Sequence, residues 1–427
     1  MDKLVYITER QPWRITLWDQ TGKTALAAKR PMLAVQYLQA ADEEGQLSIS
    51  GKVALGKAYY QIGDVGSAEF VWNSLLQPHL PPLDNRTLTE VNQNLLALYQ
   101  ANGDLTAAIS TLQRIAQLEP SNAEVSYQLG LLLAAREPET ALGYLIRAGE
   151  LDDNLASAVE ILQDNIKNQS IDDPAFNYLN VGRALGYLGE WKLAEQAFQL
   201  ATEENPTYAV AWAFLGEAQQ QLGEDDSGAL NTALQLAPDS FEVNTLAALY
   251  YQRHGDYEKA LGYLNKSAEI EPENPAITAE IANTLAQAGD IEKAMVYYHQ
   301  AAVYAPKNLT YWYLLSRFSL NNDIQVRTIG IPAARQALLI NPNDPIASDL
   351  VGYGYYLLGD ALTSERFLYR ALKADSDYAP AHFHLGMLQY SQGNYSDATV
   401  QLHRTIKLAP DTAIANQAQQ ILDRYFP

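Results

Sequence analysis

The sequence predicts an all-α chain built from a repeated helix–turn–helix unit. The main indication is a 34-residue period, which is clearest in the two successive copies that make up residues 241–308. Gly255 and Gly289 lie one period apart, and so do Pro272 and Pro306. A fixed period of this size indicates a stack of supersecondary units, each of which buries its apolar face against its neighbours.

Each unit is predicted to contain two helices separated by a Gly-Asp turn. In the second copy, apolar and small residues recur at helical spacing before Gly289 and again before Pro306. Gly289 tolerates the positive φ that ends a helix, and Asp290 can cap the helix that follows. Asn274 and Pro275 are typical of the N-cap and the first helical position, so a helix is expected to begin there.

This unit resembles the tetratricopeptide repeat (TPR), a 34-residue helix–turn–helix with small residues at repeat positions 8 and 20, Ala at 27 and Pro at 32. Ala282, Ala294, Ala301 and Pro306 occupy those positions. The resemblance covers roughly residues 25–426. It implies a right-handed α-α superhelix (a TPR solenoid) of about ten helix–turn–helix repeats with a C-terminal capping helix.

The pattern divides the chain into five segments. Residues 1–23 do not match the repeat and are expected to form an irregular N-terminal segment. Residues 24–153 form an N-terminal TPR array, and residues 174–410 form a C-terminal TPR array. Between the arrays, residues 154–173 predict one extra helix, which either shifts the superhelix or acts as a hinge between two lobes. Residues 411–427 have one apolar and one polar face, as a capping helix requires.

Two units depart from the period in the turn between their helices. The unit that starts at Ala209 has a short turn near Asp225. The unit that starts at Leu309 has an expanded turn at Asn321–Pro332. Because departures from a repeat map to loops, and loops often carry function, these two turns are candidate functional regions.

Composition excludes several classes of partner and chemistry. The chain has 29 basic and 50 acidic residues and a net charge of −21, which argues against nucleic acid and against anionic lipid surfaces as partners. It has no cysteine, so disulfides, thiolate metal sites and cysteine nucleophiles are excluded. No apolar run is long enough to predict a membrane span.

Catalytic chemistry is not predicted. His382 and His384 lie two apart on a predicted helix and therefore face different ways, and no His-Glu-x-x-His zinc motif is present. The repeats leave only the N-terminal segment free, whereas a catalytic domain needs roughly 100 residues or more. We therefore expect no cofactor, no metal and no enzymatic activity.

The resemblance also implies where a partner would bind, because the first helices of TPR units line a concave surface. Aromatic residues and arginines at inward repeat positions are the candidates for contact, although a Tyr at helical spacing often packs between helices and an Arg can pair with a neighbouring Glu. The candidate partner-binding residues are Arg183, Glu217, Asn283, Tyr313, Arg317, Tyr353, Tyr356, Phe383 and Tyr390.

The function expected from these observations is a non-enzymatic scaffold that binds peptide or helix segments of a partner protein in the concave groove. TPR domains that bind the acidic C-terminal tail of chaperones carry basic residues at positions such as 5, and repeat position 5 has no lysine in the C-terminal units of this chain, so that ligand is not expected. An alternative is the soluble, receptor-like part of a membrane-associated assembly or secretion complex whose anchor lies outside this chain. The N-terminus is not a signal peptide as written, so the chain is expected in the cytoplasm; a longer precursor would instead place it outside the cytoplasm on a membrane.

Overall fold

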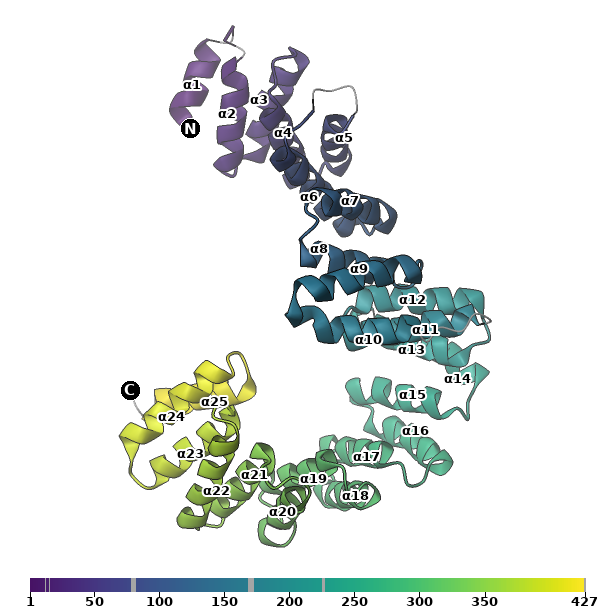
Figure 1. Cartoon of the computed structure of the whole chain (residues 1–427), viewed down its shortest axis with the longest axis vertical. Coiled ribbons are helices and arrows are strands. Elements are labelled where there is room, and N and C mark those ends of the chain that lie inside the picture. Colours follow the sequence, from purple (N-terminus) through teal and green to yellow (C-terminus); the bar gives the residue numbers. More distant parts are fainter. Residues whose placement is uncertain (12, 15, 78–81, 168–172, 225–226, 426–427) are drawn as a thin grey trace. The chain divides into compact units, whose positions relative to one another are not determined.

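The computed structural model describes all residues except 12, 15, 78–81, 168–172, 225–226 and 426–427 (Figure 1). Every regular element in the described residues is helical, which confirms the predicted all-α class. The chain divides into two compact units, Met1–Asp226 and Ser227–Pro427. No helix in the described ranges is both long and apolar enough to cross a membrane.

The first unit contains thirteen α-helices and one 3-10 turn within its described residues. They are α1 (Asp2–Arg10), α2 (Thr16–Ala27), α3 (Pro31–Glu43), α4 (Ile49–Gln61), α5 (Val65–Leu75), α6 (Asn85–Asn102), α7 (Leu105–Leu118), α8 (Ala123–Leu133), α9 (Pro138–Leu151), η1 (Asp153–Leu155), α10 (Ala156–Lys167), α11 (Pro174–Tyr187), α12 (Trp191–Glu204) and α13 (Ala209–Gln221).

The second unit continues with twelve α-helices and one π-helical turn in the described part of the chain. They are α14 (Gly228–Leu236), α15 (Phe241–Arg253), α16 (Tyr257–Ile270), α17 (Pro275–Gln287), α18 (Ile291–Tyr304), α19 (Leu309–Asn321), η2 (Val326–Gly330), α20 (Ile331–Ile340), α21 (Pro345–Leu357), α22 (Ala361–Ala374), α23 (Ala379–Ser391), α24 (Tyr395–Leu408) and α25 (Ala413–Tyr425).

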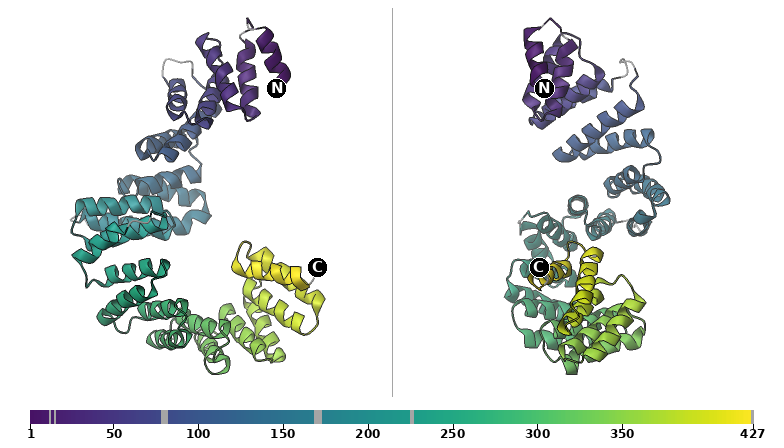
Figure 2. Two further views of the ribbon diagram at one scale, coloured as in Figure 1. Left: turned by 180° about the vertical axis from the view of Figure 1, so that it is seen from behind. Right: turned by 90° about the vertical axis from the view of Figure 1, so that its left-hand side faces the viewer.

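Most helices pack as consecutive pairs, each of which is one predicted repeat. In the first unit α2 packs on α3, α4 on α5, α6 on α7, α8 on α9 and α11 on α12. In the second unit α15, α17, α19, α21 and α23 each pack on the helix that follows. Figure 2 shows the same succession of helix pairs from two other sides. Ten such pairs lie within the described residues, in agreement with the predicted TPR solenoid of about ten repeats.

The predicted helix boundaries rest on the turn chemistry that the sequence indicates. Gly289 has a φ of 86°, and the Asp290 side chain accepts a hydrogen bond from the backbone N–H of Lys293. Asn274 caps α17 in the same way, with Pro275 in the first turn. These contacts satisfy backbone donors that a helix N-terminus leaves unpaired.

Small residues let the two helices of a pair approach closely. Ala282 and Ala294 are both fully buried, in one cluster with Leu264, Tyr298 and Leu315. Leu264 comes from the preceding pair and Leu315 from the following one, so each pair completes the core of its neighbours. This is the packing expected of a solenoid.

The expectation of an irregular segment over residues 1–23 is wrong. Residues 2–10 form α1, and α2 begins at Thr16 and packs on α3, so α2 is the first helix of the first pair. Gly22 provides the close approach, because a Cβ there would lie 2.4 Å from Cγ of Leu38. The apolar stripe of α2 is short and interrupted by polar residues, which is why its sequence does not display the repeat.

The other irregular segments are only partly described. The extra helix expected over 154–173 is present as α10, which packs on α9 and α11, while residues 168–172 lie outside the described part. Whether this segment acts as a hinge stays a prediction. The short turn near Asp225 also lies outside the described residues. The expanded turn at Asn321–Pro332 contains η2, and the expected C-terminal helix is α25.

Candidate functional site

The first helices of successive pairs form one layer in the second unit. α19 contacts α21, and α21 contacts α23. Figure 1 shows α17, α19 and α21 on the inner side of the curve of this unit, with α18, α20 and α22 on its outer side. Six of the nine candidate partner-binding residues lie on α19, α21 and α23: Tyr313, Arg317, Tyr353, Tyr356, Phe383 and Tyr390.

A buried carboxylate organises this layer. Asp349 on α21 is only 2% exposed, and its Oδ1 lies 2.7 Å from Nδ1 of His384 on α23. The imidazole of His384 stacks on the ring of Tyr353, with centroids 4.2 Å apart and an interplanar angle of 11°. Because the hydrogen bond fixes the position of the imidazole and the stacking fixes the phenol beside it, α21 and α23 are joined through polar and aromatic contacts.

A second tyrosine–carboxylate contact joins α19 to α21. The hydroxyl of Tyr313 donates a hydrogen bond of 2.7 Å to Oδ2 of Asp344. Asp344 is the N-cap of α21, and its Oδ1 accepts from the backbone N–H of Ala347 at 2.7 Å. One carboxylate thus caps one helix and anchors the preceding first helix. Such charge-assisted hydrogen bonds are stronger than neutral ones.

Three tyrosines in this region are held in their neutral form. Burial, followed by the hydrogen bond to Asp344, raises the pKa of Tyr313 well above its ordinary value. Burial, followed by the charge of Asp349, does the same to the pKa of Tyr378, the residue that precedes α23. Burial is also the main cause of the raised pKa of Tyr353. At neutral pH these three phenols are therefore protonated and uncharged, and each can donate a hydrogen bond.

Arg317 gives the region an exposed cation. It lies on α19 one helical turn after Tyr313, and its charge opposes the rise in the pKa of Tyr378. Its side chain makes no ion pair or hydrogen bond within the described part of the chain. We call the following residues the inner-face cluster: Tyr313, Arg317, Asp349, Tyr353, Tyr356, Tyr378 and His384.

Three further candidates are half-buried and take part in packing. Tyr356 stacks beside Tyr353, with ring centroids 6.2 Å apart. Phe383 packs against the cluster of Leu402, Ala418 and Leu422 that joins α24 to α25. Tyr390 contacts the rings of Tyr395 and Tyr425, at 5.6 Å and 5.1 Å. Phe383 and Tyr390 therefore help to seat the C-terminal helix.

The remaining three candidates have contacts of their own and are not members of this cluster. Arg183 on α11 places its guanidinium 5.3 Å from the ring centre of Phe214, and Glu217 on α13 accepts a hydrogen bond from Gln221. Both belong to the first unit. Asn283 on α17 donates to Glu280 at 3.1 Å. Within the second unit the structure thus brings together Tyr313, Arg317, Tyr353 and Tyr356.

Sequence reasoning missed His384, Tyr378 and the importance of Asp349. The spacing of His382 and His384 argues against a metal site and does not reveal the contact of His384 with Asp349. The contact could have been predicted from the sequence separation of His384 and Asp349, because the two residues lie 35 positions apart, one more than the period. Neighbouring positions of successive first helices face each other across a repeat interface. Among the described residues, no group of three His, Cys, Asp or Glu side chains is placed to hold a metal.

Comparison with known proteins agrees with this architecture. Residues 251–318 match the profile of the tetratricopeptide repeat family. This match covers part of the chain and, together with the helix pairs described above, supports a tetratricopeptide repeat protein. Proteins of this fold generally mediate protein–protein interactions and are typically non-enzymatic scaffolds.

Similar solved structures share little sequence with this chain. Yeast Tom70 is 14% identical, with 97% of this chain and 96% of that chain covered at a TM-score of 0.44. A tetratricopeptide repeat protein from Parabacteroides merdae is 14% identical, with 58% and 98% covered at 0.44. Cut9–Hcn1 of the APC/C is 14% identical, with 98% of each chain covered at 0.42. No curated protein sequence matches the chain. Likeness at this level supports no statement about a shared function.

Proposed function

We propose that this chain is a non-enzymatic scaffold that binds a segment of a partner protein across the inner-face cluster. The observation that carries the proposal is the unpaired cation of Arg317 beside aromatic rings whose positions are fixed by buried hydrogen bonds. Rigid aromatic side chains offer a large contact area at a small cost in conformational entropy. Arg317 supplies a donor for a carboxylate or a backbone carbonyl of the partner.

The arrangement supports binding rather than catalysis. The phenols of Tyr313 and Tyr378 have raised pKa values, so they are poor bases and poor nucleophiles at neutral pH. The carboxylates of Asp344 and Asp349 are already engaged with Tyr313 and His384. These groups hold the surface in one conformation, and preorganisation of this kind lowers the entropy lost when a partner binds.

The proposal is tested with the full chain and the proteins that co-purify with it from its natural source at modest salt. Arg317→Ala removes the exposed cation without touching the buried contacts, so the affinity for the partner should fall about tenfold or more. Arg366→Ala is the matched control, because it removes one exposed arginine from α22, where the side chain stacks on Phe367. Equal affinities for the two variants, or the absence of any stoichiometric partner, would contradict the proposal.

A further inference from the structure

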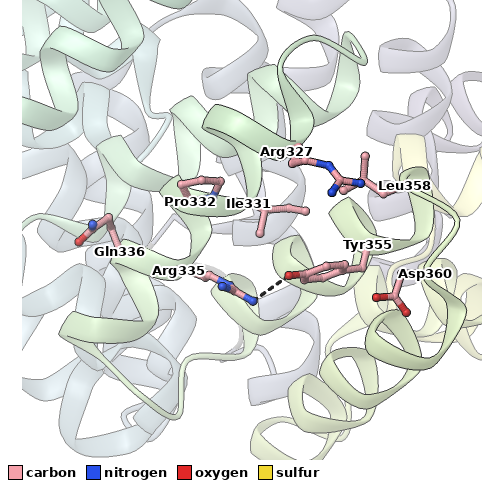
Figure 3. Close-up of a pocket in the computed structure, with 8 residues that line it drawn as sticks. All are labelled: Arg327, Ile331, Pro332, Arg335, Gln336, Tyr355, Leu358 and Asp360. Carbon is pink, nitrogen blue, oxygen red and sulfur yellow. Dashed lines mark hydrogen bonds between the residues drawn. The ribbon is translucent and has the colours of Figure 1, made fainter.

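A second feature of this unit lies on the side of α21 that faces α20 and α22. The expanded turn, α20 and α21 line a partly open cavity of about 410 Å³ (Figure 3). It is separate from the inner-face cluster, because Tyr355 points into it whereas Tyr353 stacks on His384. The lining residues are Arg327, Ile331, Pro332, Arg335, Gln336, Tyr355, Leu358 and Asp360.

The π-helical turn η2 makes this cavity. It runs directly into α20, so Arg327, Ile331 and Arg335 follow one another at intervals of four and share one face. The close-up shows the two arginines on either side of Ile331. Single π-turns inserted before or within α-helices are frequent at functional sites. Two residues near this turn, Asp323 and Gln325, have φ values of 52° and 49°, an unfavourable conformation for side chains other than glycine.

Close packing holds this face in place. Gly354 on α21 has no side chain, and a Cβ there would lie 2.5 Å from Cγ1 of Ile331. The guanidinium of Arg335 donates a hydrogen bond of 2.8 Å to the hydroxyl of Tyr355 and lies 5.7 Å from its ring centre. The ring of Tyr355 stacks in turn on Phe367, with centroids 6.4 Å apart. Arg335 is therefore oriented before any ligand arrives.

The charges in the cavity favour a ligand with one negative charge. Arg327 forms no ion pair or side-chain hydrogen bond within the ranges that the structure describes, although the chain as a whole is strongly acidic. Asp360 is the only acidic residue among those lining the cavity, and hydrogen bonds from Thr363 lower its pKa, so it stays ionised. The positive charges of Arg327 and Arg335 and the negative charge of Asp360 give the lining of the cavity a net charge of one positive unit. Ile331, Pro332 and Leu358 provide an apolar wall.

We propose that this cavity binds a monocarboxylate that carries a short apolar stem. The carboxylate pairs with the guanidinium groups of Arg327 and Arg335, whose planar geometry matches its own, and the stem lies against the apolar wall of the cavity. The carboxylate belongs either to a free carboxylic acid or to the end of a polypeptide. Both sources present the same chemistry, and the experiment separates them.

The test uses the full chain with 13C-labelled isoleucine methyl groups, observed by NMR at constant ionic strength. Hexanoate is the probe, hexanamide is its neutral isostere and inorganic phosphate is the more highly charged anion. A short peptide ending in alanyl-leucine is added with a free or an amidated C-terminus. The Ile331 methyl resonance should shift saturably with hexanoate or with the free-ended peptide, and the tighter binder of the two identifies the source.

Arg327→Ala should weaken that binding about tenfold or more, because one charge-assisted contact is lost. Arg335→Ala should do the same, and Arg424→Ala on α25 is the matched control that leaves binding unchanged. The Arg327 variant keeps the test valid if the loss of the Arg335–Tyr355 hydrogen bond disturbs folding. No saturable shift with either carboxylate, an equal shift with an amide, tighter binding of phosphate, or unchanged binding by both arginine variants would overturn the proposal.

Discussion

At the scale of single residues, the hydrogen bond between Asp349 and His384 is expected to stabilise the packing of two successive repeats. Removing either partner leaves the other side chain largely buried without its hydrogen bond, at a cost of roughly 1–3 kcal/mol. We expect Asp349→Ala and His384→Ala each to lower the free energy of unfolding. The double variant should cost less than the sum of the two, because both remove one interaction. Chemical denaturation of the four proteins measures the coupling, and additive costs would contradict the assigned contact.

A second prediction at this scale concerns alkaline pH. The pKa of Tyr378 is raised in the folded protein, mainly by burial. The neutral phenol is therefore favoured by folding. Its contribution to stability is fully present below pH about 10, the unfolded value, and is lost as the pH rises through the folded pKa. Tyr378→Phe should make the free energy of unfolding fall less steeply above pH about 10. Tyr187→Phe, at a side chain that is 80% exposed, is the control and should leave the pH dependence unchanged.

At the residue scale, the sequence predicts the position of a side chain along a helix where one helix alone decides it, while partner contact at these residues stays a prediction. Tyr313, Arg317 and Tyr353 were placed on one surface because the period fixes their positions along first helices. His384 and Tyr378 were missed because their roles depend on a contact across two repeats. The same period selects Phe383 and Tyr390, but both side chains also pack against α25.

At the scale of helices, close approach within a pair depends on small residues. Ala294 is fully buried between the helices around it, so Ala294→Leu forces extra volume into a filled core. We expect a cost of roughly 1–3 kcal/mol in the free energy of unfolding. Val296→Leu, two residues later at a position that is 63% exposed, is the control and should change stability little. Equal denaturation midpoints for the two variants would mean that the repeat register is wrong.

Helix-scale prediction from sequence was accurate where turn chemistry is strong and weak where it is absent. The Gly-Asp and Asn-Pro signals located the ends of α16, α17 and α18 correctly. The expanded turn at Asn321–Pro332 was located as well, but its π-helical geometry was not predicted, because no local signal specifies it. The sequence does not display α2 as a first helix, because the close approach at Gly22 is recognisable only beside Leu38 of the next helix.

At the scale of the whole molecule, a solenoid needs a helix that closes its last repeat. α25 packs on α24 through Ala418 and Leu422, which cover Leu402. Deleting residues 411–427 would expose this apolar surface. We therefore expect a lower free energy of unfolding and concentration-dependent association, measured by denaturation and analytical ultracentrifugation. A truncated chain that stays monomeric and equally stable would show that α25 is not a cap.

The central claim is that the inner-face cluster binds a partner protein. The most direct measurement is photo-crosslinking in the natural source, with a photoreactive amino acid placed at Met387. This residue lies on α23, one period after Tyr353 of α21. The matched position is Leu362 on α22, which is 81% exposed. The account predicts that Met387 crosslinks to one protein in stoichiometric amount and that Arg317→Ala reduces this product, while Leu362 does not yield it. No product at Met387, or the same products at both positions, would contradict the account.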